Sequence, residues 1–346
     1  MKFSSVQMFR AIAANVVVLA HLHGIEGKYG KGYVCLPDWI GLSGFTGVHF
    51  FFVISGCVIV ISSQGAKWLD FMAARVTRIY PIYWFYTTIY LLAIVLVPQS
   101  VGIGTPSPAS ILRSYLLWPD YGAPLLTVGW SLVFEMYFYV ILAIVLVAAI
   151  PLRRALPLWA GVVLLLGLFS QQQNPLLLLV GSPLVFEFIA GALVGLAIVE
   201  GHASYGRVAL MAGLATLPVG LIRYFFYAPD VSFLTVMLLA IPFSLLLYTG
   251  LSYETGGQWP RLRWMVLLGD ASYSTYLSHS LVLSAMGRMF SLSPFYGWLA
   301  EAGFVLLCIV VANLVGIVSY QLLERPSLKL CRALLGALKP KRVVAQ

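Results

Sequence analysis

The sequence predicts an all-α membrane protein that crosses the bilayer about ten times. The 346 residues are 61% hydrophobic and only 10% charged, and their mean hydropathy is +0.93. Soluble domains carry about 25% charged residues, so this composition indicates an integral membrane protein. The apolar stretches are long and continuous, whereas strands of a membrane β-barrel alternate apolar and polar residues over about ten positions. We therefore expect helices rather than strands in the bilayer.

Ten apolar stretches have the length and composition expected of helices that cross or enter a bilayer. They lie at about 6–23, 44–63, 79–97, 130–150, 157–171, 183–199, 207–222, 231–249, 272–290 and 299–323. The fifth and seventh are short, which leaves open a re-entrant or tilted helix at both places. The longest outer loop, about 98–129, is rich in Gly, Pro, Ser and aromatic residues. This composition suits a lid, a carbohydrate-facing surface or an ordinary loop.

Basic residues predict the orientation, because Lys and Arg concentrate on the cytoplasmic side. With a cytoplasmic N-terminus and ten crossings, sixteen of the 21 Lys and Arg residues fall in cytoplasmic segments and five in outer loops. Both termini are therefore expected in the cytoplasm. Residues 1–330 are predicted to form the transmembrane domain. Residues 331–346 are predicted to form a short basic cytoplasmic tail on anionic lipid.

The charge and the cysteines exclude several other functions. The net charge of +9 reflects membrane topology and not nucleic-acid binding, because no basic surface interleaved with aromatic residues occurs. Cys35, Cys57, Cys308 and Cys331 are scattered without metal-ligand spacing. We therefore expect neither a disulfide framework nor a metal site.

The first apolar stretch carries a cation and an imidazole on one helical face. Arg10 and His21 are eleven residues apart, which is about three helical turns and roughly 16 Å along the axis. An ionisable residue inside a membrane helix is costly and so indicates a functional site. In the structural alternative, Arg10 reaches lipid phosphate and a neighbouring helix satisfies His21.

A second basic pair follows at the predicted cytoplasmic end of the third stretch. Arg75 and Arg78 are three residues apart and point the same way on a helical turn. Paired guanidinium groups suit phosphates, including those of a nucleotide-bearing donor. The alternative is anchoring to lipid headgroups. Tyr80 is a further candidate for donor binding, although it also fits an interfacial aromatic belt.

An acid opens the fourth stretch. Glu135 lies about one and a half turns into it, and Ser131 is four residues earlier on the same face. An intramembrane carboxylate needs a partner, for which His21 or an inner arginine is the natural candidate. Glu135 could orient the imidazole, keep it basic or bind a donor. The alternative is a structural ion pair.

The ninth stretch carries a polar stripe. Asp270, Tyr273, Tyr276 and His279 recur at three-residue steps and so share one side of a helix. Such a stripe faces protein or water, where it lines a cavity or binds neighbouring helices together. The candidates for substrate binding are His49, Trp130, Ser131, Tyr273 and His279. For His49 a structural or interfacial role is the alternative.

These motifs together resemble the acyltransferase-3 family of membrane O-acyltransferases, in particular stand-alone members that decorate bacterial exopolysaccharides. The similar segments are Arg10-x10-His21, GVHFFFVISG at 47–56, Arg75-x-x-Arg78 with IYPIYW, WSLVFEMYFY at 130–139, LGDASYSTYLSH at 268–279 and ERP at 324–326. They run in family order and span nearly the whole chain.

The resemblance implies an O-acetyltransferase in the bacterial inner membrane. Its co-substrate would be cytoplasmic acetyl-CoA or another acyl-CoA, and its acceptor a sugar hydroxyl of an outer glycan, either free or lipid-linked. The family's functional residues correspond here to Arg10, His21, Arg75, Arg78 and Glu135.

Two positions depart from the family pattern. An acid often stands in the family where this chain has His49, and a second acid often stands where it has Met136. Either departure would bear on acceptor choice or on the proton path.

The expected mechanism uses His21 as general base on the acceptor hydroxyl, because the ordinary pKa of an imidazole, about 6.5, suits proton transfer. Direct transfer and an acyl-His21 intermediate are both compatible with the sequence. Two other classes of protein are alternatives. One is a proton-coupled transporter or flippase that uses the intramembrane Arg, His and Glu as a relay. The other is a structural or sensory membrane protein.

Overall fold

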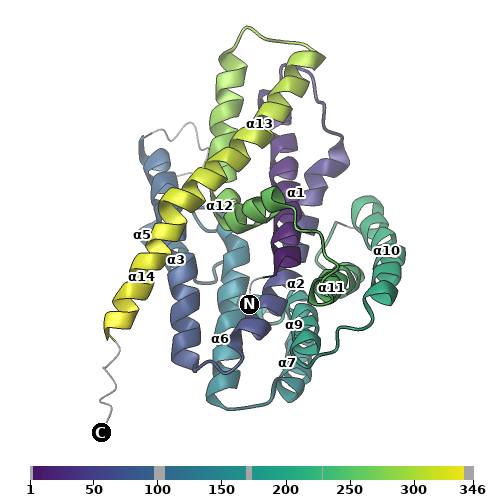
Figure 1. Cartoon of the computed structure of the whole chain (residues 1–346). Coiled ribbons are helices and arrows are strands. Elements are labelled where there is room, and N and C mark those ends of the chain that lie inside the picture. The colour runs from purple at the N-terminus through teal and green to yellow at the C-terminus, as the bar shows by residue number, and fades with distance from the viewer. Residues whose placement is uncertain (1–2, 97–105, 169–173, 228, 339–346) are drawn as a thin grey trace.

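The computed structural model describes residues 3–96, 106–168, 174–227 and 229–338, and within these ranges it is helical without strands (Figure 1). Each of the ten apolar stretches coincides with a helix. These helices are α1 (Ser4–Tyr29), α2 (Asp38–Ser63), α3 (Trp68–Leu96), α6 (Trp130–Val147), α7 (Leu152–Leu168), α9 (Val185–Val199), α10 (Gly206–Ile222), α11 (Phe233–Thr255), α12 (Arg263–Leu292) and α13 (Trp298–Ser319). Shorter elements are α5 (Pro108–Leu116), the 3₁₀ turn Thr127–Gly129, α8 (Pro175–Val180) and the π-helical turn Arg223–Tyr227.

Seven helical segments among the described residues are long and apolar enough to cross a membrane. Of the other expected crossings, α7 and α9 have only 17 and 15 residues. Helix α12 has 30 residues but falls outside the seven, which fits the polar stripe that it carries. The chain is therefore a multi-pass helical membrane protein, whereas the count of ten crossings and the cytoplasmic termini stay predictions.

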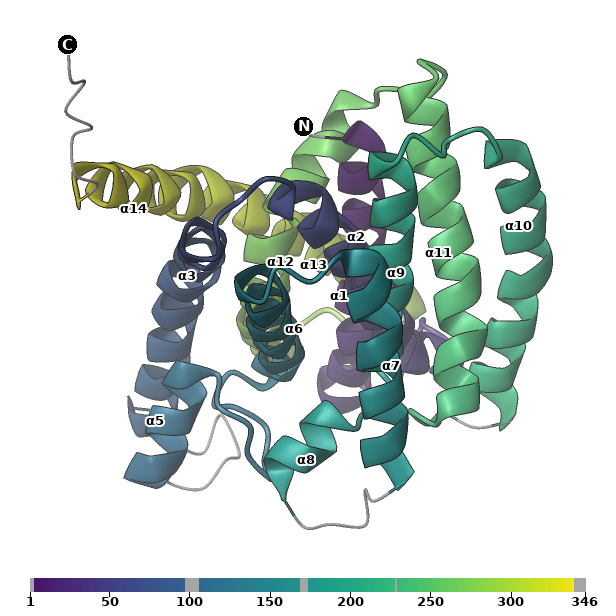
Figure 2. The same cartoon turned by 90° about the horizontal axis from the view of Figure 1, so that it is seen from below.

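Helix α1 lies inside the bundle and runs parallel to α12 (Figure 2). Near the start of α1, a Cβ on Gly269 would lie only 1.9 Å from the carbonyl oxygen of Gln7. At the other end, the Arg288 Nε atom lies 3.3 Å from the hydroxyl of Tyr29. The two helices therefore run in the same direction along their whole length, as the first and ninth of ten alternating crossings must.

Helices α2 and α9 are the second closely packed parallel pair. A Cβ on Gly191 would lie 1.8 Å from the Val53 carbonyl oxygen, and one on Gly195 would lie 2.6 Å from that of Cys57. The two contacts are four residues apart on both helices, so they repeat once per turn. Glycine allows the two backbones to touch here, as small residues do in many membrane helix pairs.

The C-terminal end corrects one expectation. In the sequence, Glu324 and Arg325 directly before Pro326 indicate a helix terminus with an ion pair, but α13 continues through the π-helical turn Tyr320–Glu324 into α14 (Arg325–Leu338). The wider turn precedes Pro326, which lacks an N–H and crowds the preceding turn of an α-helix. Glu324 accepts a hydrogen bond from Ser274 instead, at 2.6 Å.

Helix α14 extends from the bundle on the side of α3 (Figure 2). Residues 331–338 of the expected tail are therefore helical. The remainder of that tail, 339–346, lies outside the described residues.

The glycine contact between α2 and α9 gives a stability prediction. Replacing Gly191 by Ala should force the helices apart and destabilise the protein by about 1–3 kcal/mol, the usual cost of overpacking. Gly161→Ala in α7 is the matched control, because a Cβ there meets no atom within 4 Å. Thermal unfolding of the purified protein in detergent measures both. A Gly191→Ala midpoint equal to or above that of the unaltered protein would contradict this packing.

Candidate active site

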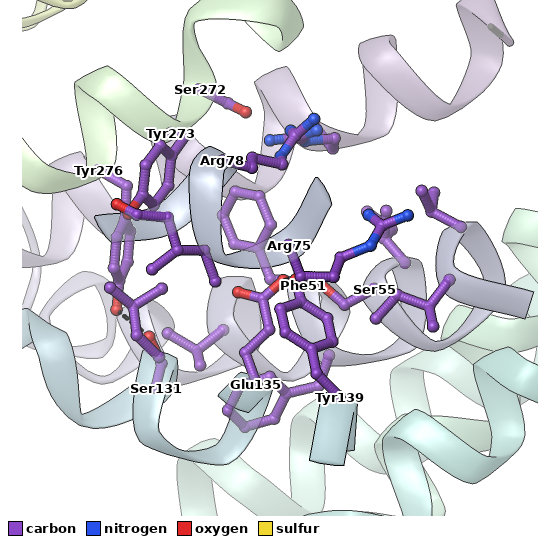
Figure 3. Close-up of a pocket in the computed structure, with 18 residues that line it drawn as sticks. Phe51, Ser55, Arg75, Arg78, Ser131, Glu135, Tyr139, Ser272, Tyr273 and Tyr276 are labelled. Carbon is purple, nitrogen blue, oxygen red and sulfur yellow. Dashed lines mark hydrogen bonds between the residues drawn. The ribbon is translucent and has the colours of Figure 1, made fainter. Parts of the chain in front are cut away.

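A cavity lies among α1, α2, α3, α6 and α12 (Figure 3). Its polar lining consists of Arg10, Ser55, Arg75, Arg78, Ser131, Glu135, Tyr139, Ser272, Tyr273 and Tyr276. Apolar side chains such as Phe51 complete the wall. The fold thus brings the cation of the first stretch, the arginine pair, the acid and part of the polar stripe into one site.

The arginine pair reaches this cavity from one side of α3, as the three-residue spacing predicts (Figure 3). The Arg75 guanidinium lies over two aromatic rings, 5.3 Å from the centroid of Phe71 and 5.8 Å from that of Tyr139. Its Nη2 atom donates to the Ser62 hydroxyl at 2.5 Å. Its Nε atom is buried without a hydrogen-bond partner among the described residues. The pair therefore keeps donor capacity for an anion.

Glu135 is held within the cavity by hydroxyl groups. It accepts one hydrogen bond from Tyr139, a turn later on α6, and one from Ser55 at 3.3 Å. The expectation that Glu135 orients His21 is not met, because its hydrogen bonds go to these hydroxyls. The other expected partner, an inner arginine, fits better, since Arg10 lies within electrostatic range of Glu135.

A second, larger cavity adjoins the first at the end of the bundle where α14 begins. Arg10, Val58 and Arg78 line both cavities. The two spaces therefore meet at two guanidinium groups. The larger cavity is also lined by Gln7, Asp270, Glu324, Arg325, Lys329 and Arg332.

His21 lies beyond the lining of both cavities and faces His279 of α12. The two ring centroids are 4.8 Å apart, and the ring planes are nearly perpendicular at 74°. The Nδ1 atom of His21 is 2.9 Å from the Val17 carbonyl oxygen, and that of His279 is 2.7 Å from the Tyr276 carbonyl oxygen. A carbonyl oxygen only accepts, so each Nδ1 atom carries the proton. In the neutral ring, the Nε2 lone pair of His21 is then available to accept a proton.

The polar stripe of α12 connects these parts. Asp270 lines the larger cavity, Tyr273 and Tyr276 line the central one, and His279 contacts His21. The tyrosine hydroxyls also bind neighbouring elements: Tyr273 donates to the Ile79 carbonyl at 2.8 Å. Both sequence-based interpretations of the stripe, as a cavity lining and as a bond between helices, therefore hold.

One predicted donor residue, Tyr80, lies outside the central and the larger cavity. The Tyr80 hydroxyl donates to the Leu116 carbonyl at 2.9 Å, which ties α3 to the end of α5. Tyr80 lines neither the central nor the larger cavity, so its expected contact with the donor has no support in the geometry. Ser131, by contrast, lines the central cavity and lies 2.8 Å from the hydroxyl of Tyr276.

His49 forms a buried pair with Glu187 that the sequence did not reveal. Its Nδ1 atom is hydrogen-bonded to Glu187 Oε1, and both side chains are fully buried. The contact joins α2 to α9 one turn before the Gly191 contact. The geometry therefore favours the structural role for His49 over a contact with substrate. The sequence shows His49 and Glu187 only as isolated polar positions within apolar stretches, and the parallel packing of their helices brings them together.

This pair gives a second stability prediction. Removing one partner of a buried pair leaves the other uncompensated, which costs about 3–5 kcal/mol, whereas replacing both by apolar residues is often neutral. Glu187→Leu alone should therefore lower the unfolding midpoint, and His49→Leu combined with Glu187→Leu should recover much of the loss. If the unfolding midpoint of the double variant falls by the sum of the decreases measured for His49→Leu and Glu187→Leu separately, the two residues do not act as a pair.

Trp130 lines a further pocket between α5, α6 and α8, which we call the outer pocket because the predicted topology places this end of the bundle outside the cytoplasm. Trp118 and the paired side chains of Arg113 and Asp120 line the same pocket. The Arg113 Nη1 atom lies 2.9 and 3.0 Å from the two carboxylate oxygens of Asp120, and this hydrogen bonding lowers the pKa of the Asp120 carboxyl. Because Ser131 follows Trp130 directly, the outer pocket and the central cavity adjoin the same turn of α6.

Comparison with known proteins identifies the family. Residues 3–319 match the acyltransferase domain of the acyltransferase-3 family. The chain belongs to this family. It is 30% identical over 308 residues to the exopolysaccharide production protein ExoZ of Rhizobium meliloti (strain 1021). That alignment covers 84% of this chain and 91% of ExoZ. No solved structure matches the chain.

Family membership confirms the resemblance carried by the motifs, and it establishes the chain as a membrane acyltransferase. The matched region contains α1 to α13 and therefore both histidines and the whole central cavity. Helix α14 begins after it. Membership also favours an enzyme over the transporter, flippase and purely structural alternatives.

Proposed function

We propose that this acyltransferase moves an acyl group, in the simplest case acetyl, from cytoplasmic acyl-CoA to a hydroxyl of an exopolysaccharide or related surface glycan. One observation carries the proposal: polar side chains follow α12 from the basic larger cavity, past Arg10 and Arg78, to His21. Such a path suits a donor that enters at one membrane face and an acceptor hydroxyl that is reached from the other. The enzyme would act in the bacterial cytoplasmic membrane.

The donor would be held first by its phosphates. Arg75 and Arg78 offer guanidinium donors on one face of α3, and guanidinium groups bind phosphate oxygens in pairs. Arg10 lies where the two cavities meet, beside Arg78, so it is placed to hold phosphate. Glu135, retained by Tyr139 and Ser55, offsets the positive charge of the arginines.

His21 would be the general base. Its Nε2 atom takes the proton of the acceptor hydroxyl while the hydroxyl oxygen attacks the thioester carbonyl carbon. The carbon–sulfur bond then breaks, and the coenzyme A thiolate leaves and takes up a proton. The hydrogen bond from Nδ1 to the Val17 carbonyl fixes the tautomer that this step needs. His279 packs against the ring and positions it.

The acceptor sugar would approach through the outer pocket. Indole rings such as those of Trp118 and Trp130 present broad apolar faces, and Arg113 and Asp120 supply groups that hydrogen-bond to hydroxyls. The similarity to ExoZ, whose name refers to exopolysaccharide production, supports a glycan of this class. Neither observation identifies the sugar.

A histidine two residues away in the same helix provides a matched control for the general base. His21→Ala should lower acyl transfer by about 10²–10⁴-fold, the usual contribution of a positioned base. His23→Ala should retain activity, because His23 instead hydrogen-bonds the Leu36 carbonyl at 3.1 Å. The measurement is ester content of the host's surface polysaccharide at matched membrane levels of both variants. Equal ester content for His21→Ala and His23→Ala would remove His21 from the chemistry.

Release of coenzyme A by the purified protein distinguishes the proposed acyltransferase from a transporter. A transporter would move substrate without consuming acyl-CoA. Acyl-CoA consumption that requires the glycan acceptor is the result expected here.

A further inference from the structure

Helix α14 lies beyond the matched acyltransferase domain and yet contributes to the larger cavity. Arg325, Leu328, Lys329 and Arg332 line that cavity. Their spacing of three, four and seven residues from Arg325 places them on one face of the helix. The basic face of α14 is therefore turned to the cavity.

The charge of the larger cavity suits an anion with several phosphates. Five basic side chains line it, two from the junction with the central cavity and three from α14. The acidic lining consists of Asp270 and Glu324. The lining therefore carries a formal excess of positive charge. A phosphate monoester carries about −1.5 to −2 charges at pH 7, so a monoester together with a diphosphate would be compatible with this excess.

Aromatic side chains in the same cavity offer ring faces on which a nucleobase can stack. Phe3 and Tyr320 both line it. The Arg325 guanidinium lies 5.8 Å from the centroid of the Tyr320 ring, so a cation and an aromatic face are adjacent. Aromatic rings and arginine planes are the usual platforms for stacking of nucleobases.

We propose that the larger cavity binds the 3′-phosphoadenosine end of coenzyme A and that Lys329 and Arg332 of α14 hold its 3′-phosphate. The inference rests on the proposed function, since it takes acyl-CoA as the donor. The diphosphate then lies near Arg78, where the cavities meet, and the pantetheine arm extends into the central cavity toward Tyr276. A lipid headgroup phosphate is the other source of the same chemistry, and the experiment distinguishes the two.

Binding of coenzyme A and of dephospho-coenzyme A, which lacks only the 3′-phosphate, tests the proposal. The full-length protein is placed in nanodiscs of phosphatidylcholine, and dissociation constants are measured for both ligands. The unaltered protein should bind coenzyme A about tenfold or more tightly than dephospho-coenzyme A, as expected for hydrogen bonds to a charged group. The double variant Lys329→Gln with Arg332→Gln should lose this preference and bind dephospho-coenzyme A unchanged.

Two further variants control for charge and folding. Arg263→Gln removes an exposed cation at the start of α12 that lines neither cavity, and it should leave both dissociation constants unchanged. Arg332→Lys in an otherwise unaltered protein should retain part of the preference. The unfolding midpoint of each variant is measured as well, and only variants whose midpoint equals that of the unaltered protein are compared.

Each remaining outcome overturns the inference in a distinguishable way. Equal binding of the two ligands by the unaltered protein, or an unchanged preference in the double variant, removes α14 from 3′-phosphate binding and leaves the proposed donor intact. The unfolding midpoints of the unaltered protein and of the double variant are also measured with added phosphatidylglycerol. If the double variant keeps its preference for coenzyme A but is no longer stabilised by this lipid, the basic face of α14 binds lipid headgroups. Failure of the unaltered protein to bind either ligand contradicts the proposed function itself.

Discussion

One half-buried cation inside the helical bundle, Arg10, is the constraint on which the arrangement of the site depends. An ionisable residue inside a membrane helix is costly unless it meets polar partners. Arg10 lies where two cavities meet, within electrostatic range of Glu135 and Glu324. The close contact of Gly269 with Gln7 holds α12 against α1 one turn before this point. Helix α12 must therefore supply polar groups along the shared face.

The parallel course of α1 and α12 extends that constraint to the pair His21 and His279. Because the two helices remain together, the eleven residues from Arg10 to His21 run alongside the stripe from Asp270 to His279. One helix pair thus connects the charged cavity with the histidine pair. This connection relates donor binding at one end to proton transfer at the other in the proposed mechanism.

Features that depend on local periodicity could be predicted from the sequence. The ten apolar stretches each became a helix, and the shared faces of Arg75 with Arg78 and of the α12 stripe were read correctly from their spacing. Such features need only the geometry of a single helix. The number of crossings is harder, because short or polar helices such as α9 and α12 owe their place to packing within the bundle.

Features that depend on which helices meet could not be predicted in this way. The sequence left His21 or an inner arginine as the partner of Glu135, and only the bundle shows its carboxylate beside Tyr139 and Ser55 and within electrostatic range of Arg10. The partner of His49 became evident only from the parallel contact between α2 and α9. For the C-terminal segment, the sequence showed the positive charge but not the cavity that this segment lines.

For that segment, its position beside the larger cavity depends on the π-helical turn that carries α13 into α14. A turn of this kind has no clear signal in the sequence apart from the proline that follows it.

A cryo-EM structure with a non-hydrolysable acyl-CoA analogue would test the central claim most directly. The claim is that the two cavities form one donor site leading to His21. The account predicts density for the nucleotide beside α14, for the diphosphate near Arg78, and for the acyl end near Tyr276 and oriented toward His21. An analogue bound outside both cavities, or bound with its acyl end directed away from His21, would contradict it.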